Sequence, residues 1–317
     1  MSHLSRSLAV RTSSLAVSVI MVFALAGCSK KEQPTAAPAT AQTFASPEAA
    51  GKALMEAAKS ANQEGMLAIF GPGSKDLIYS GDAAEDKASF DGFVKSYDAM
   101  NRWRKLPDGS ELLLVGADNQ AFPIPLKKNS AGQWYFDTAA GKEEILSRRI
   151  GRDENAAIDV CVALADAQAE YFSQKHDGVK QYAQKFISDP GKQNGLYWES
   201  AEGQPRSPVG PLVAFATDEG YNLKSGAHQA FHGYYFRILD KQGPDAKGGA
   251  KNYIVNGKMT GGFVYIAYPA TYNDTGVMTF IIDQNRAVYQ KNLGKDTADL
   301  AKAIAEFNPD KSWTVLQ

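Results

Sequence analysis

The feature that most constrains the fold is a set of five short apolar runs between residues 233 and 294. The runs cover residues 233–239, 253–255, 262–268, 276–283 and 287–291. Each is rich in β-branched and aromatic residues and is bounded by Gly, Pro, Asn or Asp, which is typical of strands joined by short loops. The stretch therefore predicts an antiparallel meander. It contains no recognisable nucleophile motif, metal cluster or phosphate loop, so it predicts an architecture and not a reaction.

The two faces of this meander differ in side-chain size. Strand residues alternate between faces, so residues 276–283 place Met278 and Phe280 on one face and Thr279 on the other. We expect the bulkier face to pack on a helix and Thr279 to face solvent. That arrangement would leave an exposed sheet face for a binding partner.

The N-terminus has the pattern of a secretory signal. Arg6 and Arg11 precede an apolar stretch at residues 15–25, and no acidic residue occurs before Glu32. The apolar stretch is too short to span a bilayer as a mature helix. Residues 1–27 are therefore predicted to be a signal peptide that is removed after export.

The predicted signal ends in Leu-Ala-Gly-Cys at residues 25–28. This sequence resembles the lipobox of bacterial lipoproteins, which implies cleavage between Gly27 and Cys28 and a lipid on the Cys28 sulfur. Ser29 follows, where an aspartate would favour retention in the inner membrane. The resemblance thus implies an exported protein that is anchored in the cell envelope, in the outer membrane and facing the periplasm.

Residues 28–43 are predicted to be a flexible tether, because they include two prolines and no large apolar side chain after the cysteine. The formal net charge of the whole chain is −1. Removing the signal removes Arg6 and Arg11 and no acidic residue, so the mature chain is slightly acidic. This balance gives no support for a nucleic-acid partner.

A chain of 317 residues exceeds the usual single core, so we expect two domains. Helical spacing and caps indicate helices around residues 46–61, 66–70 and 90–100, and alternation indicates strands at residues 111–115, 121–126 and 133–136. Pro123 and Pro125 place the middle strand at an edge or make it irregular. Residues 44–150 thus predict an N-terminal α+β domain, which looks like the cone-shaped fold of the nuclear-transport-factor-2 superfamily.

The second domain is predicted to begin at a joint near Gly151. A short basic helix at residues 142–149 precedes the joint, and a longer amphipathic helix begins at Asp153 and places Cys161 on its buried face. No activating base is visible near this cysteine, so we interpret it as a core residue. Residues 151–317 then form a C-terminal α+β domain, a helix packed on the antiparallel meander.

The segment at residues 174–230 is the least regular part of the chain, with four prolines and many glycines. Residues 175–187 are expected to hold a helical turn, and residues 297–307 and 313–316 a helix and a final strand. An amphipathic helix, an irregular stretch and a meander are together similar to the globular head of type IV pilins and pseudopilins. The sequence departs from a prepilin in one respect: where a prepilin has its hydrophobic assembly helix, this chain has a separate domain.

The candidate binding residues lie at the start of the meander. His228 and His232 are four residues apart, as two zinc ligands on a helix would be, but the neighbouring sequence favours a loop that enters a strand, so no metal site is predicted. Tyr234 and Tyr235 belong to a dense aromatic set, in which a core role with a hydroxyl at the rim competes with a binding surface. No catalytic residue and no cofactor is predicted.

Several runs carry a resemblance to one family. They are Phe-Pro-Ile-Pro-Leu at residues 122–126, the segments 134–146 and 148–152, and Gly-Tyr-Tyr-Phe-Arg at residues 233–237 through Gly-Gly-Phe at residues 261–263. These runs look like the uncharacterised bacterial family called domain of unknown function 2950. The resemblance implies an exported protein. It implies no reaction, because none is assigned to that family.

The resulting expectation is a non-catalytic lipoprotein of the cell envelope that binds an envelope protein or scaffolds an assembly. Two alternatives stay open: a small-ligand binder that uses the N-terminal cone, and an atypical envelope hydrolase. The polarity of the pockets distinguishes the three. An apolar cone favours a ligand, a cleft with perturbed carboxylates or a histidine favours an enzyme, and a broad apolar patch favours a partner.

Overall fold

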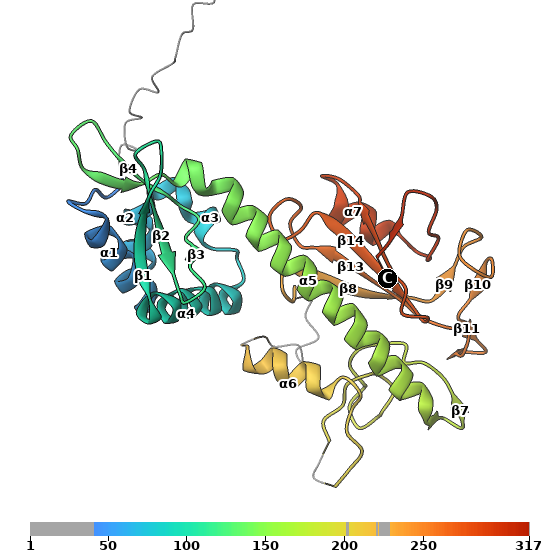
Figure 1. Cartoon of the computed structure of the whole chain (residues 1–317). Helices are drawn as coiled ribbons and strands as arrows, with labels where there is room; N and C mark the ends of the chain where they lie inside the picture. The colour runs from blue at the N-terminus through green and yellow to red at the C-terminus, as the bar shows by residue number, and fades with distance from the viewer. Residues whose placement is uncertain (1–40, 201–202, 220, 222–228, 317) are drawn as a thin grey trace, which may run out of the picture. The chain divides into compact units, whose positions relative to one another are not determined.

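The computed structural model describes residues 41–200, 203–219, 221 and 229–316 (Figure 1). These residues form helices and several antiparallel sheets, which confirms the α+β class. The predicted signal peptide, Cys28 and most of the tether lie outside the described residues. Within the described ranges, no helix combines the length and the apolar character needed to cross a membrane.

Four helices and a 3-10 turn open the described chain. They are α1 (Pro47–Lys59), α2 (Gln63–Phe70), η1 (Pro72–Ser74), α3 (Lys75–Ile78) and α4 (Ala83–Ala99). The cap at Ser46 forms, because its hydroxyl accepts the Ala49 amide at 3.2 Å. The structure adds a cap at Asp82, whose carboxylate accepts the amides of Ala84 and Glu85 at the start of α4. The predicted helices are therefore confirmed, although the third begins earlier than its first large apolar residue, Phe90.

The first sheet follows these helices. Its strands are β1 (Asn101–Lys105), β2 (Glu111–Val115), β3 (Gln120–Ala121), β4 (Leu126–Lys128) and β5 (Trp134–Phe136), in the order β1-β2-β4-β5 with β3 beside β2. The segment with Pro123 and Pro125 breaks between β3 and β4, as predicted. Strand β1 was not predicted, because four of its five residues are polar or charged and mostly exposed.

A single helix, α5 (Thr138–Ser173), runs for 36 residues through the predicted joint at Gly151 (Figure 1). The predicted break there is wrong. Gly151 has open space where a side chain would be, and a lone glycine costs a helix only about 0.5–1 kcal/mol relative to alanine. Ile145 packs on the N-terminal core and Cys161 lies in the second core, so α5 belongs to both. The division of the chain into domains at Gly151 stays a prediction.

The predicted meander forms the second large sheet. Its strands are β8 (Tyr234–Leu239), β13 (Val264–Pro269), β14 (Met278–Asp283), β15 (Val288–Asn292) and β16 (Thr314–Val315), in the order β16-β15-β14-β13-β8. The run at residues 253–255 lies outside this sheet. It contributes β11 (Ile254–Val255), which pairs with β12 (Lys258–Met259) in a short hairpin.

Both faces of this sheet are covered. On one face Tyr265 accepts a hydrogen bond from Gln168 of α5, and the register places Phe280 on the same face. On the other face Arg237 donates to two carbonyls at the end of α7 (Thr297–Ala303), each at 2.7 Å. Thr279 lies on the α7 face and is 0% exposed, so the prediction that it faces solvent is wrong. Helix α7 covers the face on which a partner was expected to bind.

The segment between α5 and β8 is largely irregular. It holds the hairpin of β6 (Lys175–His176) and β7 (Val179–Lys180), helix α6 (Gly210–Asp218) and no helical turn at residues 175–187, where one was expected. A second hairpin, β9 (Lys241–Gln242) with β10 (Lys251–Asn252), follows β8. The rings of Tyr182 and Phe186 pack on Phe263 and Tyr265, so this segment extends the cover that α5 provides.

Candidate functional site

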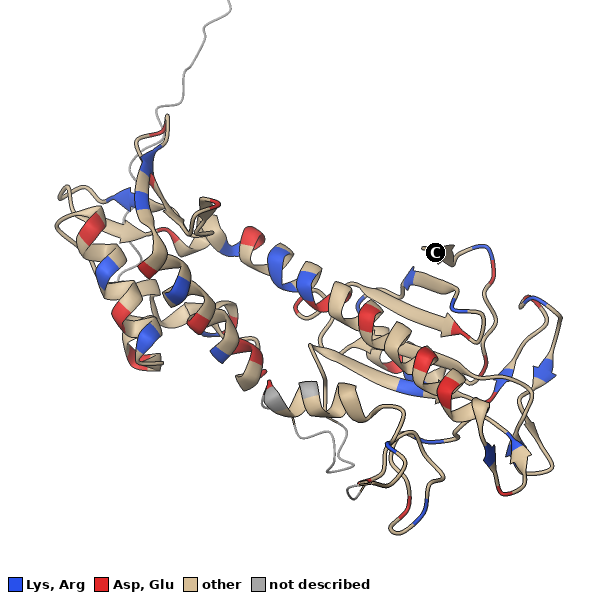
Figure 2. Cartoon of the chain, turned by 60° about the horizontal axis from the view of Figure 1, so that its bottom comes forward, with Lys and Arg blue, Asp and Glu red and all other residues tan. Residues whose placement is uncertain are grey.

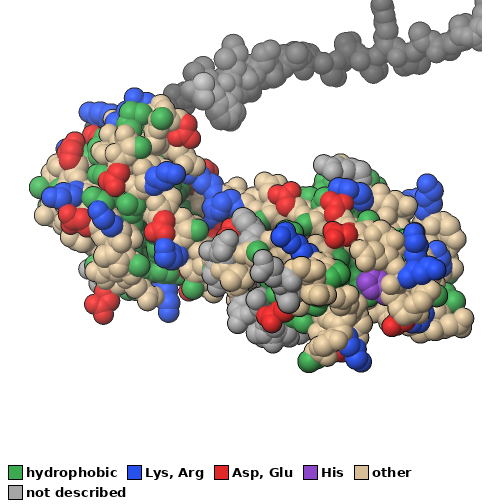
Figure 3. Space-filling model, turned by 90° about the horizontal axis from the view of Figure 1, so that it is seen from below, with side chains coloured by type: hydrophobic (Ala, Val, Ile, Leu, Met, Phe, Trp, Pro, Cys, Tyr) green, Lys and Arg blue, Asp and Glu red, His purple; other side chains and the backbone are tan. Residues whose placement is uncertain are grey.

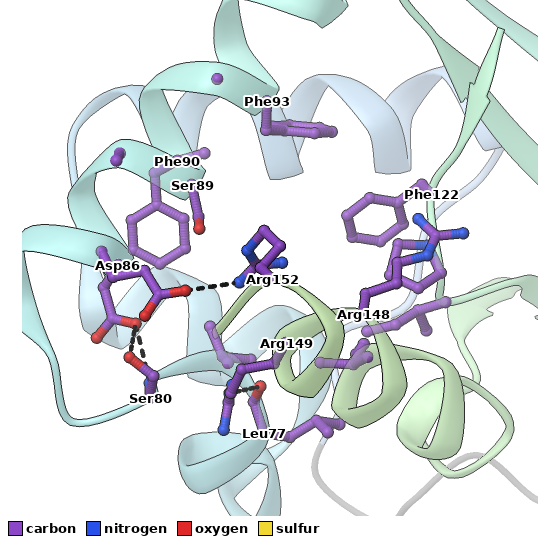
Figure 4. A pocket seen from close by; sticks show the side chains of 18 of the residues that line it. Leu77, Ser80, Asp86, Ser89, Phe90, Phe93, Phe122, Arg148, Arg149 and Arg152 are labelled. Carbon is purple, nitrogen blue, oxygen red and sulfur yellow. Dashed lines mark hydrogen bonds and ion pairs between the residues drawn. The ribbon is translucent and has the colours of Figure 1, made fainter. Parts of the chain in front are cut away.

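A pocket of about 670 Å³ lies between α4, the first half of α5 and the segment after β3 (Figure 4). We call it the α4–α5 pocket. Its walls are mainly apolar, and these apolar side chains come from α1, α2, α4, α5, strand β2 and the segment after β3: Leu54, Met66, Phe70, Phe90, Phe93, Val115, Phe122, Ile124 and Ile145. A pocket of this size and character is typical of small-molecule sites.

Three phenylalanines stand around the opening of the pocket. Phe90 and Phe93 lie one turn apart on α4, and Phe122 comes from the segment after β3 (Figure 4). The Phe93 and Phe122 rings are 5.4 Å apart, and all three side chains are only half-buried. Partly exposed aromatic rings that face a cavity offer apolar area to a ligand at little cost in side-chain entropy.

The first half of α5 supplies three arginines to the pocket. Figure 2 shows that the Lys and Arg residues of α5 are confined to this half. Arg148 donates to the Glu144 carboxylate and to the Ala121 carbonyl, both at 2.7 Å. Arg149 is buried, donates to the Leu77 carbonyl at 2.7 Å and pairs with the carboxylate of Asp274. These contacts fix the helix against the neighbouring elements.

The acidic wall of the pocket begins on α4. Asp86 accepts hydrogen bonds from the backbone amide and the hydroxyl of Ser80, both at 2.9 Å. Burial raises the pKa of Asp86 above its ordinary value, although these two hydrogen bonds act in the opposite direction. One turn earlier, Asp82 accepts a hydrogen bond from the Tyr221 hydroxyl at 2.6 Å.

A pair of carboxyl groups completes this wall. Arg152 donates to Glu85 Oε1 at 2.9 Å. Glu85 Oε2 and Asp153 Oδ2 are buried and have no donor among the described residues. Burial raises the pKa of Asp153 to about 9, and the hydrogen-bonded Glu85 carboxyl adds to this increase.

The structure places the predicted binding residues in different environments. Tyr234 is a core residue whose hydroxyl donates to the Met278 carbonyl at 2.9 Å, and burial raises its pKa. Tyr235 is half-buried on the opposite sheet face, beside Tyr268. His232 lines the α4–α5 pocket, and its Nε2 lies 3.1 Å from Glu219 Oε2. His228 lies outside the described residues, as do Gly27 and Cys28.

Cys161 is fully buried, and burial raises the pKa of its thiol to about 12, which agrees with the predicted core role. Across residues 41–200, 203–219, 221 and 229–316, no three His, Cys, Asp or Glu side chains are grouped to hold a metal ion.

Sequence reasoning missed Glu85, Asp86 and Asp153. One signal was available for Asp153, because it lies one helical turn before Ala157 on the apolar stripe that continues to Cys161. A carboxylate at such a position is either a cap or a buried polar group. The predicted break at Gly151 favoured the cap, and the continuous helix makes it a buried group instead.

Comparison with known proteins gives one match. Residues 41–316 match the family model described as "Protein of unknown function (DUF2950)". No curated protein matches the chain. No solved structure matches it either.

Proposed function

We propose that this chain, which belongs to the DUF2950 family of proteins of unknown function, is a non-catalytic lipoprotein of the cell envelope that binds a small amphipathic ligand in the α4–α5 pocket. The observation that supports the proposal is the pocket itself, with a volume of about 670 Å³, mainly apolar walls and charged side chains from α4 and α5. Ligand sites combine this apolar lining with a few placed polar groups. A binding role was expected, and the pocket favours a small ligand over a protein partner.

The described surface offers less support for a protein partner. Its exposed large apolar side chains are Val179, Val255, Leu300, Val315 and Leu316. Only the last two are neighbours in the chain. On the face drawn in Figure 3 the apolar side chains are interspersed with charged ones. Partner sites usually present a larger contiguous apolar patch.

The envelope location rests on the lipobox-like sequence before Cys28. Cells that express the protein and are grown with an alkyne fatty acid should label it, and the Cys28→Ala variant should not be labelled. In cell fractionation, the wild type should be found in the membrane fraction and the variant in the soluble fraction. A Cys28→Ala protein that still carries the fatty acid would contradict the anchor.

Filling the α4–α5 pocket should abolish ligand binding. Ser89 lines the pocket on α4 (Figure 4), so Ser89→Trp would place an indole in the cavity. We expect the purified mature protein to bind the neutral dye N-phenyl-1-naphthylamine and Ser89→Trp to bind it at least about tenfold more weakly, a loss of about 1.4 kcal/mol. Fluorescence titration measures both.

The matched control is Lys95→Trp. Lys95 is exposed on the same helix and does not line the pocket, so this variant should bind the dye as the wild type does. Equal affinity of the wild type and Ser89→Trp would place the dye elsewhere. A loss in both variants would point to damage to α4, and thermal unfolding of each variant distinguishes damage from blocking.

One observation favours the alternative of an atypical envelope hydrolase, namely the carboxyl pair of Glu85 and Asp153. Perturbed carboxyl groups that line a cavity are frequent in active sites. The hydrolase would be supported by turnover of a simple ester, glycoside or peptide substrate that Asp153→Asn abolishes. Binding of the unreacted dye with no turnover supports the non-catalytic role.

A further inference from the structure

Two short hairpins lie side by side beyond the C-terminal end of α5. They are the pairs β6–β7 and β11–β12. Lys258 Nζ of β12 lies 3.0 Å from Asp177 Oδ2 in the turn of the first hairpin. The Gln184 side chain, which follows β7, donates to the Gly257 carbonyl in the turn of the second hairpin at 2.9 Å. These contacts hold the two turns next to each other.

Each hairpin turn presents a valine to solvent. The Asp-Gly pair at residues 177–178 and the Asn-Gly pair at residues 256–257 all have positive φ, as the central residues of tight type I′ turns do. Val179 directly follows the first turn, and Val255 directly precedes the second. The two side chains are 40% and 48% exposed. The turns therefore keep two apolar side chains in water at fixed positions.

Lysines surround these two valines. Residues 175–180 and 251–259 contain four lysines and one acidic residue, Asp177, which is the partner of Lys258. Lys175, Lys180 and Lys251 are exposed and form no ion pair with any described residue. Figure 2 shows Lys residues on the short strands beyond the end of α5, with few acidic residues among them. We call the following residues the hairpin surface: Lys175, Val179, Lys180, Lys251 and Val255.

Two of these lysines face each other within one hairpin. Lys175 and Lys180 are direct cross-strand partners in β6–β7. Like charges in this position destabilise a strand pair. The last acidic residues of α5 do not offset the pair, because Asp166 pairs with Arg286 and Glu170 forms no ion pair with either lysine. Stability alone would favour an acidic residue at one of the two positions, so the pair points to an anionic partner.

The combination of lysines and exposed valines favours the surface of a bilayer. Two isolated valines are too small a patch for a protein interface. Apolar side chains flanked by lysines can instead enter the boundary between headgroups and acyl chains. Each lysine close to an anionic bilayer strengthens binding about fivefold. A soluble polyanion would satisfy the lysines but would leave both valines in water.

We propose that the hairpin surface docks on an anionic phospholipid bilayer. Val179 and Val255 enter the headgroup layer, and the three unpaired lysines face the lipid phosphates. This contact is separate from the α4–α5 pocket and needs no lipid on Cys28, so it can be measured on a protein without the anchor.

The test uses the purified mature chain with Cys28→Ala, which has no site for the lipid. Sedimentation measures its partition onto vesicles of phosphatidylcholine and onto vesicles of an equal mixture of phosphatidylcholine and phosphatidylglycerol. We expect at least about tenfold stronger partition onto the mixed vesicles. High salt should remove most of this preference, because it screens exposed charges.

The diagnostic variant combines Lys175→Gln and Lys180→Gln in this protein. It should partition at least about tenfold more weakly onto the mixed vesicles. The matched control combines Lys59→Gln and Lys95→Gln, which remove the same charge from exposed positions on α1 and α4 and should change little. The diagnostic variant should fold, since it removes an unfavourable pair. Its thermal midpoint should equal or exceed that of the parent protein.

A fluorescent label on each turn locates the contact. Cys161 is buried and its thiol pKa is raised to about 12, so a cysteine introduced by Val179→Cys or Val255→Cys is the one that reacts. The nitrobenzoxadiazole label should become brighter and emit at shorter wavelength on the mixed vesicles at both positions. The same label on Lys95→Cys should not change.

Three results would overturn the proposal. The first is equal partition onto the two kinds of vesicle, or none onto either. The second is binding to the mixed vesicles with unchanged emission at both turns, which would place the contact elsewhere. The third is a DNA duplex that binds as tightly as the mixed vesicles, which would make the partner a soluble polyanion. Binding of N-phenyl-1-naphthylamine should be the same in the lysine variants as in the parent, so the pocket is judged separately.

Discussion

Replacing Arg149 with alanine is expected to lower the free energy of unfolding by about 3 to 5 kcal/mol. The Arg149 side chain is 5% exposed and joins three parts of the fold, because it lies on α5, donates to the Leu77 carbonyl of α3 and pairs with Asp274 in the loop before β14. Alanine would leave the carbonyl without its donor and the carboxylate without its partner charge. Denaturant unfolding at pH 7 measures the loss.

The control for this prediction is Arg286→Ala. Arg286 pairs with Asp166 of α5, but the two side chains are 57% and 52% exposed. Surface pairs of this kind contribute between 0 and about 1 kcal/mol, so the control should lose little. Equal losses in the two variants would mean that the Arg149 contacts do not form in solution.

Phe280→Ala should cost a similar amount, about 3 to 5 kcal/mol, from lost burial and the cavity left behind. Phe280 is 1% exposed on the α5 face of the sheet, and its ring lies 5.9 Å from that of Tyr234. Its neighbour Thr279 provides the contrast. The Thr279 hydroxyl is buried and has no hydrogen-bond partner among the described residues, so Thr279→Val should be neutral or stabilising.

Chemical denaturation of both variants checks this contrast. A large loss in Thr279→Val would show that the hydroxyl makes a hydrogen bond in solution. A small loss in Phe280→Ala would show that α5 packs less closely on β14 than the structure describes.

The parts of the fold that could be predicted are those in which local pattern and tertiary packing agree. The meander strands β8, β13, β14 and β15 are runs rich in β-branched and aromatic residues with turn residues between them, and the cap at Ser46 precedes an amphipathic helix. Strand β1 is polar and depends on pairing with β2, which local pattern does not report. Burial of Thr279 depends on α7, whose position over the sheet no local pattern specifies.

The candidate site was less predictable for a related reason. In the sequence, its apolar residues have the pattern of ordinary core residues, and its charged residues have the pattern of an exposed helix surface. Glu85 lies on α4 and Asp153 on α5, and only packing of the two helices brings their carboxyl groups together. A single carboxylate on an apolar helical stripe gives a weak signal, and its meaning depends on whether the helix continues past Gly151. Because α5 is continuous, Asp153 is a buried group within the helix and not a cap at its start.

The continuity of α5 also bears on the order in which the chain can become folded as it is made. The helix supplies Ile145 to the first core early in synthesis, but the partners of its second half, β13 and β14, are made only after the long irregular segment. The apolar stripe around Cys161 and Leu164 must wait uncovered during that interval. Apolar surface that is transiently exposed in this way binds chaperones, and it promotes aggregation when no chaperone covers it. We expect a chain that is truncated before β13 to have a folded first core. The second half of its α5 should stay exposed and bind chaperones.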